Sequence, residues 1–511
     1  MTLIVADKHI NLQKSIAITC SAIVLALCGS GLSADAAETR SSNSRRTFAD
    51  WCRQKADLSP EAKHTVEVLL KEAKTTECDA ADRKLSLLTD LSLGANGISD
   101  IKPLASLTNL IKLDLINNGI SDIKPLQSLT NLTHLDLGLN QISDIKPLES
   151  LTKLTHLSLD YLPPIYLPAF PAPEPAFPAP EFVPKNNPIS DIQPLESLTN
   201  PTEPVLDNDP ISDIKPLQSL TNLTELSLRG RQITDIKPLA SLTKLTELSL
   251  RDNQISDIKP LVSLTKLTSL NLSENQISDI KPLASLTKLT GLGLGDNQIS
   301  DIKPLESLTG LGLGDSQSDE LLALVSFTKV TGLNLGKNQI SDIKPLEYLT
   351  NLTKLHLYNN QISDIKPLKS LTNLTEISLS ENQISDIKPL ASLTKLTWLF
   401  LENNQISDIK PLQSLTKLTR LELSDIEISD IKPLQSLTNL TEFYLKNNRI
   451  SDIKPLASLT KLTWLELSKN QISDIKPLAS LTNLTGLNLS GNPITPKTCP
   501  LKPESICEWQ P

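Results

Sequence analysis

Aromatic and charged residues recur in one register in the last third of the chain. Trp398 and Trp464 are 66 residues apart, three repeats of a 22-residue unit, and Phe400 and Tyr444 are two repeats apart. Exposed rings surrounded by charge carry much of the binding energy in protein interfaces. We expect Arg420 to stack on Trp398. The candidate ligand-binding residues, called the aromatic patch below, are His356, Tyr358, Trp398, Phe400, Glu402, Arg420, Glu422, Tyr444, Lys446, Trp464 and Glu466.

A second cluster combines imidazoles and carboxylates. His134 and His156 are 22 residues apart, with Asp114 and Asp136 in the adjacent register. If each repeat forms one strand of a parallel sheet, these side chains converge within about 5–7 Å. Such a set can hold a divalent metal. A polar strand surface is the commoner outcome of this spacing, so we assign no metal site.

The chain holds little that indicates catalysis. Four histidines lie beyond residue 36, and there is no GxSxG nucleophile motif and no phosphate-binding loop. We therefore expect neither enzymatic activity nor a cofactor. A basic spot of Arg229, Arg231 and Arg251 could take an acidic group. The net charge of −9 argues against a nucleic-acid partner, because phosphate binding requires clustered Lys and Arg.

The elements that must position these residues are copies of one unit. From Leu85 onward the chain repeats LTxLTxLxLxxNQISDIKPLxS, a short leucine-rich repeat, and this explains the aromatic content of only 3%. The alternating leucines predict strands, and the Asn amide is expected to satisfy backbone groups between coils. Pro in DIKPL favours 3₁₀ turns over long helices, and the Asp and Lys of this motif are expected to form ladders of opposite charge. We predict an α/β leucine-rich repeat solenoid with a parallel concave β-sheet, short 3₁₀ turns on the convex side and a small helical N-terminal cap.

The repeat is interrupted at two places. A Pro-rich insert at 162–186 contains AFPAPEP followed by AFPAPEF, which predicts an extended loop. Phe170, Phe177 and Phe182 in this insert could present a ligand motif or fold over the concave face, although a tolerated insertion is the simpler interpretation. The second interruption is a degenerate coil at 318–339 that lacks the usual Pro and could form a true helix. Gly-rich strands flank it and are expected to leave that part of the sheet nearly bare.

The sequence NQISDIKPLxSLTNLTxLxL closely resembles the repeat of the internalin family of bacterial surface proteins, over residues of about 85–494. The resemblance implies a right-handed horseshoe with 3₁₀ turns outside, a protein-binding concave sheet and a helical N-terminal cap. Here Ser59 and Pro60 begin a predicted helix with Val66, Leu69 and Leu70 on one side. Seventeen residues follow Ile494, without an immunoglobulin-like module, a sorting motif or wall-binding repeats. We therefore do not transfer the family's role in host-cell invasion.

Two features of the sequence indicate export: a signal peptide at its start and pairs of cysteines near its two ends. A basic start, an apolar run at 15–27 and the small residues of Ala34-Asp35-Ala36 indicate a signal peptide over 1–36, cleaved near Ala36; lipidation at Cys28 is the alternative. The run is too short to span a bilayer. Four cysteines remain, two at each end, and we predict the disulfides Cys52–Cys78 and Cys499–Cys507. The predicted domains are the signal peptide (1–36), the N-terminal cap (37–84), the solenoid of about 18 coils (85–494) and the C-terminal cap (495–511).

The outward positions of the strands are the variable sites of the repeat, so recognition is expected there. We predict a monomeric, secreted or surface-exposed protein, extracellular or periplasmic, that binds a protein, peptide or glycan on its concave face. One alternative is a structural, self-associating surface protein, in which the aromatic residues only reflect the preference of strands for such side chains. Ice or mineral binding through threonine columns is a third interpretation.

Overall fold

The computed structural model describes residues 46–161, 211, 213–309 and 329–509 of the chain. The predicted signal peptide, the Pro-rich insert with Phe170, Phe177 and Phe182, and the first half of the degenerate coil lie outside these residues. None of the helices in the described part of the chain is long and apolar enough to cross a bilayer.

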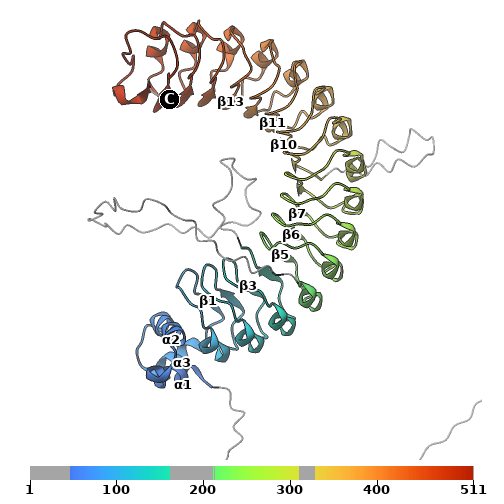
Figure 1. Cartoon of the computed structure of the whole chain (residues 1–511), viewed down its shortest axis with the longest axis vertical. Coiled ribbons are helices and arrows are strands. Elements are labelled where there is room, and N and C mark those ends of the chain that lie inside the picture. Colours follow the sequence, from blue (N-terminus) through green and yellow to red (C-terminus); the bar gives the residue numbers. More distant parts are fainter. Residues whose placement is uncertain (1–45, 162–210, 212, 310–328, 510–511) are drawn as a thin grey trace, which may run out of the picture. The chain divides into compact units, whose positions relative to one another are not determined.

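A single parallel sheet runs through the described residues (Figure 1). Each strand pairs in parallel with the strands before and after it, and residues 22 positions apart face each other wherever the repeat is uninterrupted. Pairing continues from β4 to β5 and from β8 to β9, across both interruptions. The strands are β1 (Asp90–Ser92), β2 (Lys112–Asp114), β3 (His134–Asp136), β4 (His156–Ser158), β5 (Glu225–Ser227), β6 (Glu247–Ser249), β7 (Ser269–Asn271), β8 (Gly291–Gly293), β9 (Gly332–Asn334), β10 (Lys354–His356), β11 (Glu376–Ser378), β12 (Trp398–Phe400), β13 (Arg420–Glu422), β14 (Glu442–Tyr444), β15 (Trp464–Glu466), β16 (Gly486–Asn488) and β17 (Cys507–Glu508).

On the side of each coil opposite its strand, the chain forms a short 3₁₀ turn (Figure 1). These turns begin at the Lys of the KPLxS motif, and Pro follows directly, so the predicted role of Pro is confirmed. The 3₁₀ elements are η1 (Lys55–Asp57), η2 (Lys102–Ser106), η3 (Lys124–Ser128), η4 (Lys146–Ser150), η5 (Lys215–Ser219), η6 (Lys237–Ser241), η7 (Lys259–Ser263), η8 (Lys281–Ser285), η9 (Lys303–Thr309), η10 (Lys344–Tyr348), η11 (Lys366–Ser370), η12 (Lys388–Ser392), η13 (Lys410–Ser414), η14 (Lys432–Ser436), η15 (Lys454–Ser458), η16 (Lys476–Ser480) and η17 (Glu504–Ile506).

The Asp that precedes each turn acts through the backbone. Its Oδ1 accepts the N–H of the Lys two residues later, at 2.9 Å from Asp100 to Lys102 and at 3.0 Å from Asp452 to Lys454. Ion pairs between these side chains form only in some coils, as at Lys102, where Nζ lies 3.0 Å from Asp100 Oδ2. The Asp therefore holds the start of the turn in every such coil, and the expected charge ladder is a lesser effect.

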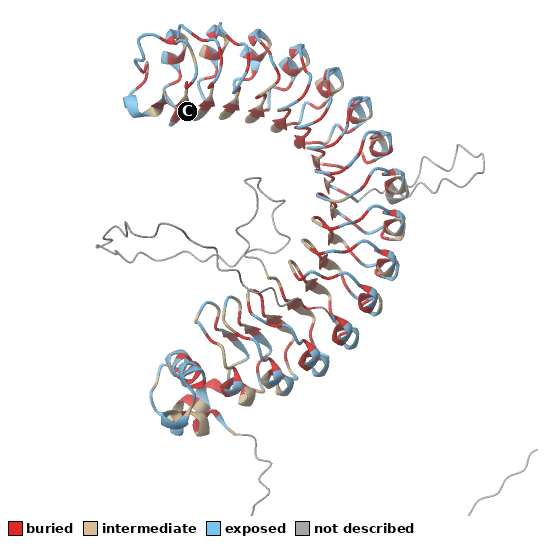
Figure 2. Ribbon diagram, in the orientation of Figure 1, coloured by how far each residue is buried: buried red, intermediate tan, exposed pale blue. Residues whose placement is uncertain are grey.

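Leu and Ile fill the space between the strands and the turns. The repeated positions form continuous buried columns, and Figure 2 shows buried residues, in red, along the described coils. Because the repeat supplies the same apolar residues in every coil, burial of one coil depends on its neighbours, which is typical of a solenoid. The outward strand positions between these columns remain available for function.

Buried asparagines join adjacent coils, as the sequence predicts. Asn404 is representative: its Nδ2 donates to the carbonyls of Leu379 and Leu401, both at 3.0 Å, and its Oδ1 accepts the N–H of Ile384 at 3.0 Å. Equivalent bonds recur at the Asn positions of the other intact coils. Each amide thus pairs backbone groups that would otherwise be buried without partners.

Three helices form the N-terminal cap: α1 (Phe48–Arg53), α2 (Pro60–Ala73) and α3 (Cys78–Leu85). Helix α2 begins where the sequence predicts, because Ser59 Oγ accepts the N–H of Ala62 at 3.2 Å. Val66 and Leu69 are buried against the first coil, and Leu70 is partly buried.

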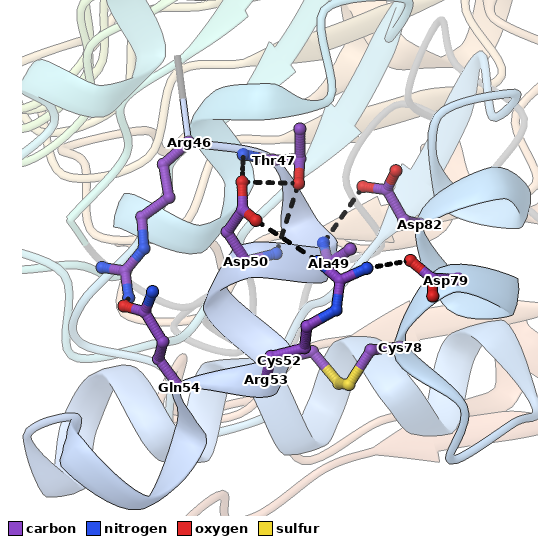
Figure 3. A network of polar contacts seen from close by, with 10 residues as sticks. All are labelled: Arg46, Thr47, Ala49, Asp50, Cys52, Arg53, Gln54, Cys78, Asp79 and Asp82. Atoms are coloured by element: carbon purple, nitrogen blue, oxygen red, sulfur yellow. Dashed lines mark hydrogen bonds and ion pairs between the residues drawn. A yellow bond between two sulfur atoms is a disulfide. The ribbon is translucent and has the colours of Figure 1, made fainter. Parts of the chain in front are cut away.

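Polar bonds and a disulfide tie α1 to α3 (Figure 3). Thr47 and Asp50 form a capping box at the start of α1. The N–H of Ala49 donates to Asp82 Oδ1 at 3.2 Å, and Arg53 pairs with Asp79. The predicted Cys52–Cys78 and Cys499–Cys507 disulfides are both present. The second disulfide closes the C-terminal segment from which β17 extends the sheet.

Candidate functional site

The aromatic patch lies on outward strand positions from β10 to β15, in the register that the sequence predicts. Two adjacent columns of facing residues cross this part of the sheet. One column contains Trp398, Arg420, Glu442 and Trp464, and the other contains Phe400, Glu422, Tyr444 and Glu466. The patch is therefore a continuous surface, and Glu402, Lys446 and Tyr358 follow the ends of its strands.

Two details of the patch differ from the sequence prediction. Phe400 is only 4% exposed and belongs to the supporting layer of the patch. Arg420 does not stack on Trp398: its guanidinium carbon lies 5.3 Å from the ring centre of Phe400 and 5.4 Å from that of Tyr444. Arg420 Nε also lies 3.4 Å from Oε2 of Glu442, the facing residue on β14.

Glycines on neighbouring strands let two rings of the patch lie close to the sheet. A Cβ atom built at Gly486 would lie 2.2 Å from the ring of Trp464, and one at Gly336 would lie 2.3 Å from the ring of Tyr358. Each ring thus occupies the place where a side chain of the adjacent coil would lie. Trp464 and Tyr358 are consequently half-buried and held in position before any partner binds.

A buried glutamate that the sequence prediction omitted belongs to the patch. Glu376 is 3% exposed and faces Trp398 on the neighbouring strand. His356 Nε2 lies 3.3 Å from Glu376 Oε1, and Lys354 Nζ lies 3.6 Å from Oε2. The signal was available in the sequence, since Glu376 precedes Trp398 by one repeat of 22 residues. Glu376 is thus a buried carboxylate whose charge faces Lys354 and His356 within the protein.

Burial also changes the protonation of the patch. It raises the pKa of Glu422 to about 7, even though Oε1 accepts the N–H of Ser424 at 2.9 Å. Burial raises the pKa of Tyr444 to about 12, assisted by the hydrogen bond that its hydroxyl donates to Glu442 Oε2 at 3.0 Å. Burial is also the main cause that raises the pKa of Glu402. Glu466 accepts the N–H of Ser468 at 2.8 Å, so this carboxylate is fixed along its own strand.

The second predicted cluster forms a stack of imidazoles. The rings of His134 and His156 are 3.9 Å apart and nearly parallel, with 10° between their planes. His156 Nε2 lies 2.9 Å from Oε1 of Glu225. In the part of the chain that the structure describes, no group of three or more His, Cys, Asp or Glu is arranged to hold a metal ion. Burial lowers the pKa of both imidazoles, with the charge of Lys112 as a further cause.

A groove of about 970 Å³ runs over β1 to β7 and contains this stack. We call it the N-terminal groove. Six carboxylates line it, together with Lys112 and the two imidazoles: Asp90, Asp114, Asp136, Asp160, Glu225 and Glu247. The sequence prediction missed Glu225 and Glu247, although the first pairs in register with His156 and the second with Glu225.

The predicted basic spot is not an open anion site. Arg231 is 1% exposed and occupies a position of the asparagine ladder, where its Nε donates to the carbonyl of Leu159. Burial lowers the pKa of Arg231 to about 10. Arg251 pairs with Glu274, whose Oε1 lies 2.6 Å from its Nη2. Two of the three arginines are therefore engaged within the protein.

Sequence models of leucine-rich repeats match most of the coils described above. A model of two repeat copies matches residues 86–128, 221–263, 243–285, 265–307, 328–370, 372–414, 394–436, 416–458 and 460–499, and a single-repeat model matches 128–145. The chain belongs to the leucine-rich repeat family. No curated protein matches its sequence.

Solved structures place this leucine-rich repeat protein in the internalin-like class. An internalin (InlF) from Listeria monocytogenes is 31% identical, with 81% of this chain and 97% of that chain covered and a TM-score of 0.55. A leucine-rich repeat protein of Leptospira interrogans is 25% identical, covering 84% of this chain and 97% of that chain, with a TM-score of 0.61. The functional domain of InlJ from Listeria monocytogenes shares the fold at 20% identity, 87% and 81% coverage and a TM-score of 0.60.

The disulfide at each end of the described chain agrees with an extracellular or surface location, because such bonds persist in oxidising surroundings.

Proposed function

We propose that this protein is a secreted or surface-exposed binding protein that holds a protein or peptide partner on its aromatic patch. The proposal includes a cleaved signal peptide over residues 1–36. The observation that carries it is the arrangement of Trp398, Tyr444 and Trp464 on adjacent outward columns, half-buried and interspersed with charges of both signs.

Fixed rings of this kind suit a binding surface for two reasons. A ring that is already packed, as Trp464 is against Gly486, loses little conformational entropy when a partner covers it. The surrounding carboxylates and Arg420 can then pair with polar groups of the partner and set its orientation. A protein or peptide, which combines apolar side chains with both charges, matches this surface better than a uniformly polar ligand.

Replacement of two rings tests the proposal. The wild-type chain, W398A/W464A and the control Y348A are immobilised and exposed to a native extract, and the retained proteins are quantified. Tyr348 is an exposed aromatic residue on the opposite side of its coil, at the end of η10, so its loss matches the loss of a ring without touching the patch.

We expect retention of the partner to fall thirtyfold or more in W398A/W464A, because truncating central aromatic residues typically costs 2 kcal/mol or more of binding free energy. Retention by Y348A is expected to equal that of the wild type. Equal retention by W398A/W464A and Y348A, with both variants folded by circular dichroism, would show that the partner does not use the patch.

A further inference from the structure

The N-terminal groove is a second surface on the same sheet, and the aromatic patch does not account for it. Its lining residues lie on β1 to β7, whereas the patch begins at β10. Between them, β8 and β9 expose mostly glycine, and a Cβ atom at Gly332 would meet nothing within 4 Å. The two surfaces are thus separated by a bare stretch of sheet.

The charge of the groove is strongly unbalanced. Six carboxylates face Lys112 as the only Lys or Arg of the lining. The groups that could neutralise acids from within are partly committed: Ser92 donates to Asp114 at 2.7 Å, Ser227 donates to Asp160 at 2.6 Å, and one imidazole, His156, contacts Glu225. These neutral hydroxyls satisfy lone pairs but add no positive charge.

The histidine stack cannot supply the missing charge either. Two imidazolium rings 3.9 Å apart would repel each other, so the stack favours at most one added proton. Burial pushes the pKa values of His134 and His156 down and those of Asp136, Glu225 and Glu247 up, which is the pattern of desolvated groups. A cation from outside would relieve the repulsion among the carboxylates.

The dimensions of the groove favour an extended chain over a single ion. Seven strands at about 4.8 Å spacing span roughly 29 Å, which accommodates about eight or nine extended residues. The carboxylates occur along most of this length, from Asp90 on β1 to Glu247 on β6. Ammonium and guanidinium groups form the strongest hydrogen bonds with carboxylates, and a partly dry groove strengthens them.

We propose that the N-terminal groove binds an extended peptide segment rich in lysine or arginine, independently of the aromatic patch. The segment lies across the strands, and its cationic side chains pair with Asp114, Asp136, Glu225 and Glu247. This site goes beyond the proposed function, since it involves other strands and another ligand chemistry.

The test uses the full chain without its predicted signal peptide and a fluorescein-labelled decalysine peptide as the probe. Fluorescence anisotropy at physiological ionic strength gives the Kd for the wild type, for E225Q/E247Q and for the control E61Q/E149Q. Glu61 on α2 and Glu149 on η4 are exposed and lie off the groove, so both double variants change the net charge by the same amount. W398A/W464A completes the set.

We expect the Kd of E225Q/E247Q to rise at least tenfold, while those of E61Q/E149Q and W398A/W464A stay within twofold of the wild type. No measurable wild-type binding, or equal losses in the two Gln variants, would overturn the proposal, because the probe would then respond only to net charge. Loss of binding in W398A/W464A alone would overturn it in favour of a single site on the patch. Equal affinity of the wild type for a decaglutamate peptide would also contradict it.

Discussion

The N-terminal groove and the aromatic patch are built on the same scaffold and differ only in their outward columns. In the groove, Asp, His and Glu leave a hollow with little positive charge, as around the stacked His134 and His156. In the patch, rings lie on the sheet and charges pair beside them, as Arg420 does with Glu442. The inward strand residues are buried in both regions, although those of the groove strands are slightly more exposed and contribute to the groove lining. In this protein the repeat determines the position of each outward side chain. The sizes of adjacent outward side chains determine whether the surface forms a groove or a packed patch.

The largest loss of stability is expected when an asparagine of the buried ladder is removed, and it should be similar in both regions. Asn253 below the groove and Asn404 below the patch share three buried bonds to backbone groups of two coils, and Asn253 also accepts the N–H of Arg231 at 3.1 Å. Alanine at either position leaves several buried polar groups unpaired, at about 1–3 kcal/mol for each unsatisfied group. We expect N253A and N404A to lower the free energy of unfolding by similar amounts, measured by urea denaturation. A loss confined to one variant would show that the two regions do not share one scaffold.

A larger residue at Gly486, where the ring of Trp464 packs against the backbone, should affect the patch alone. Valine at Gly486 would displace the ring of Trp464 and is expected to cost about 1–3 kcal/mol, a typical penalty for overpacking. Tryptophan fluorescence should shift to longer wavelength as the ring enters water. The matched variant G332V, at an open position on β9, should change neither stability nor fluorescence. Unchanged fluorescence in G486V would show that the ring of Trp464 does not depend on the absence of a side chain at Gly486.

Protonation of Glu422 gives the patch a pH dependence. Its folded-state pKa of about 7 lies above the ordinary value of 4.5, so the folded protein binds this proton more tightly than the unfolded chain does. Stability from this group is therefore complete at pH values below 4.5 and is lost as the pH rises through 7. We expect E422Q to be more stable than the wild type by on the order of 2 kcal/mol at pH 8, with little difference at pH 4. Parallel stability curves for the two proteins between pH 4 and 8 would contradict the buried position of this carboxyl.

The smallest change in stability is expected at Arg420, whose guanidinium lies near the rings of Phe400 and Tyr444. R420K keeps the charge but loses the flat guanidinium that lies over Phe400 and Tyr444. We expect a loss of about 0.5–1 kcal/mol of stability, the usual size of such a contact. Decalysine binding at the groove should not change. A stability equal to that of the wild type in thermal unfolding would show that the charge alone accounts for the role of Arg420.

Sequence periodicity was sufficient to predict most of the scaffold. The spacing of 22 residues predicted the strands, the asparagine ladder, the 3₁₀ turns and the facing columns of the patch, because each depends on a repeated backbone position. The disulfides followed from the even number of cysteines at the two ends. Predicting these features requires no knowledge of side-chain orientation.

The features that sequence reasoning missed depend on the orientation and burial of side chains. Register placed Arg420 beside Trp398, but the guanidinium lies against Phe400 and Tyr444 of the other column, and its Nε faces Glu442. The burial of Phe400 depends on the volumes of the side chains around it, which periodicity does not report. Glu376, Glu225 and Glu247 were not predicted as site residues, although the repeat fixes their positions, because register does not report which carboxylates are buried.

The central claim is that the partner covers the aromatic patch. Hydroxyl-radical footprinting of the complex with the retained partner tests it most directly, since it reports the solvent contact of individual rings. We expect Trp398, Tyr444 and Trp464 to lose most of their oxidation when the partner is bound, while Trp51 in the N-terminal cap and His134 in the groove keep theirs. Unchanged oxidation of the three patch residues in a saturated complex would contradict the claim.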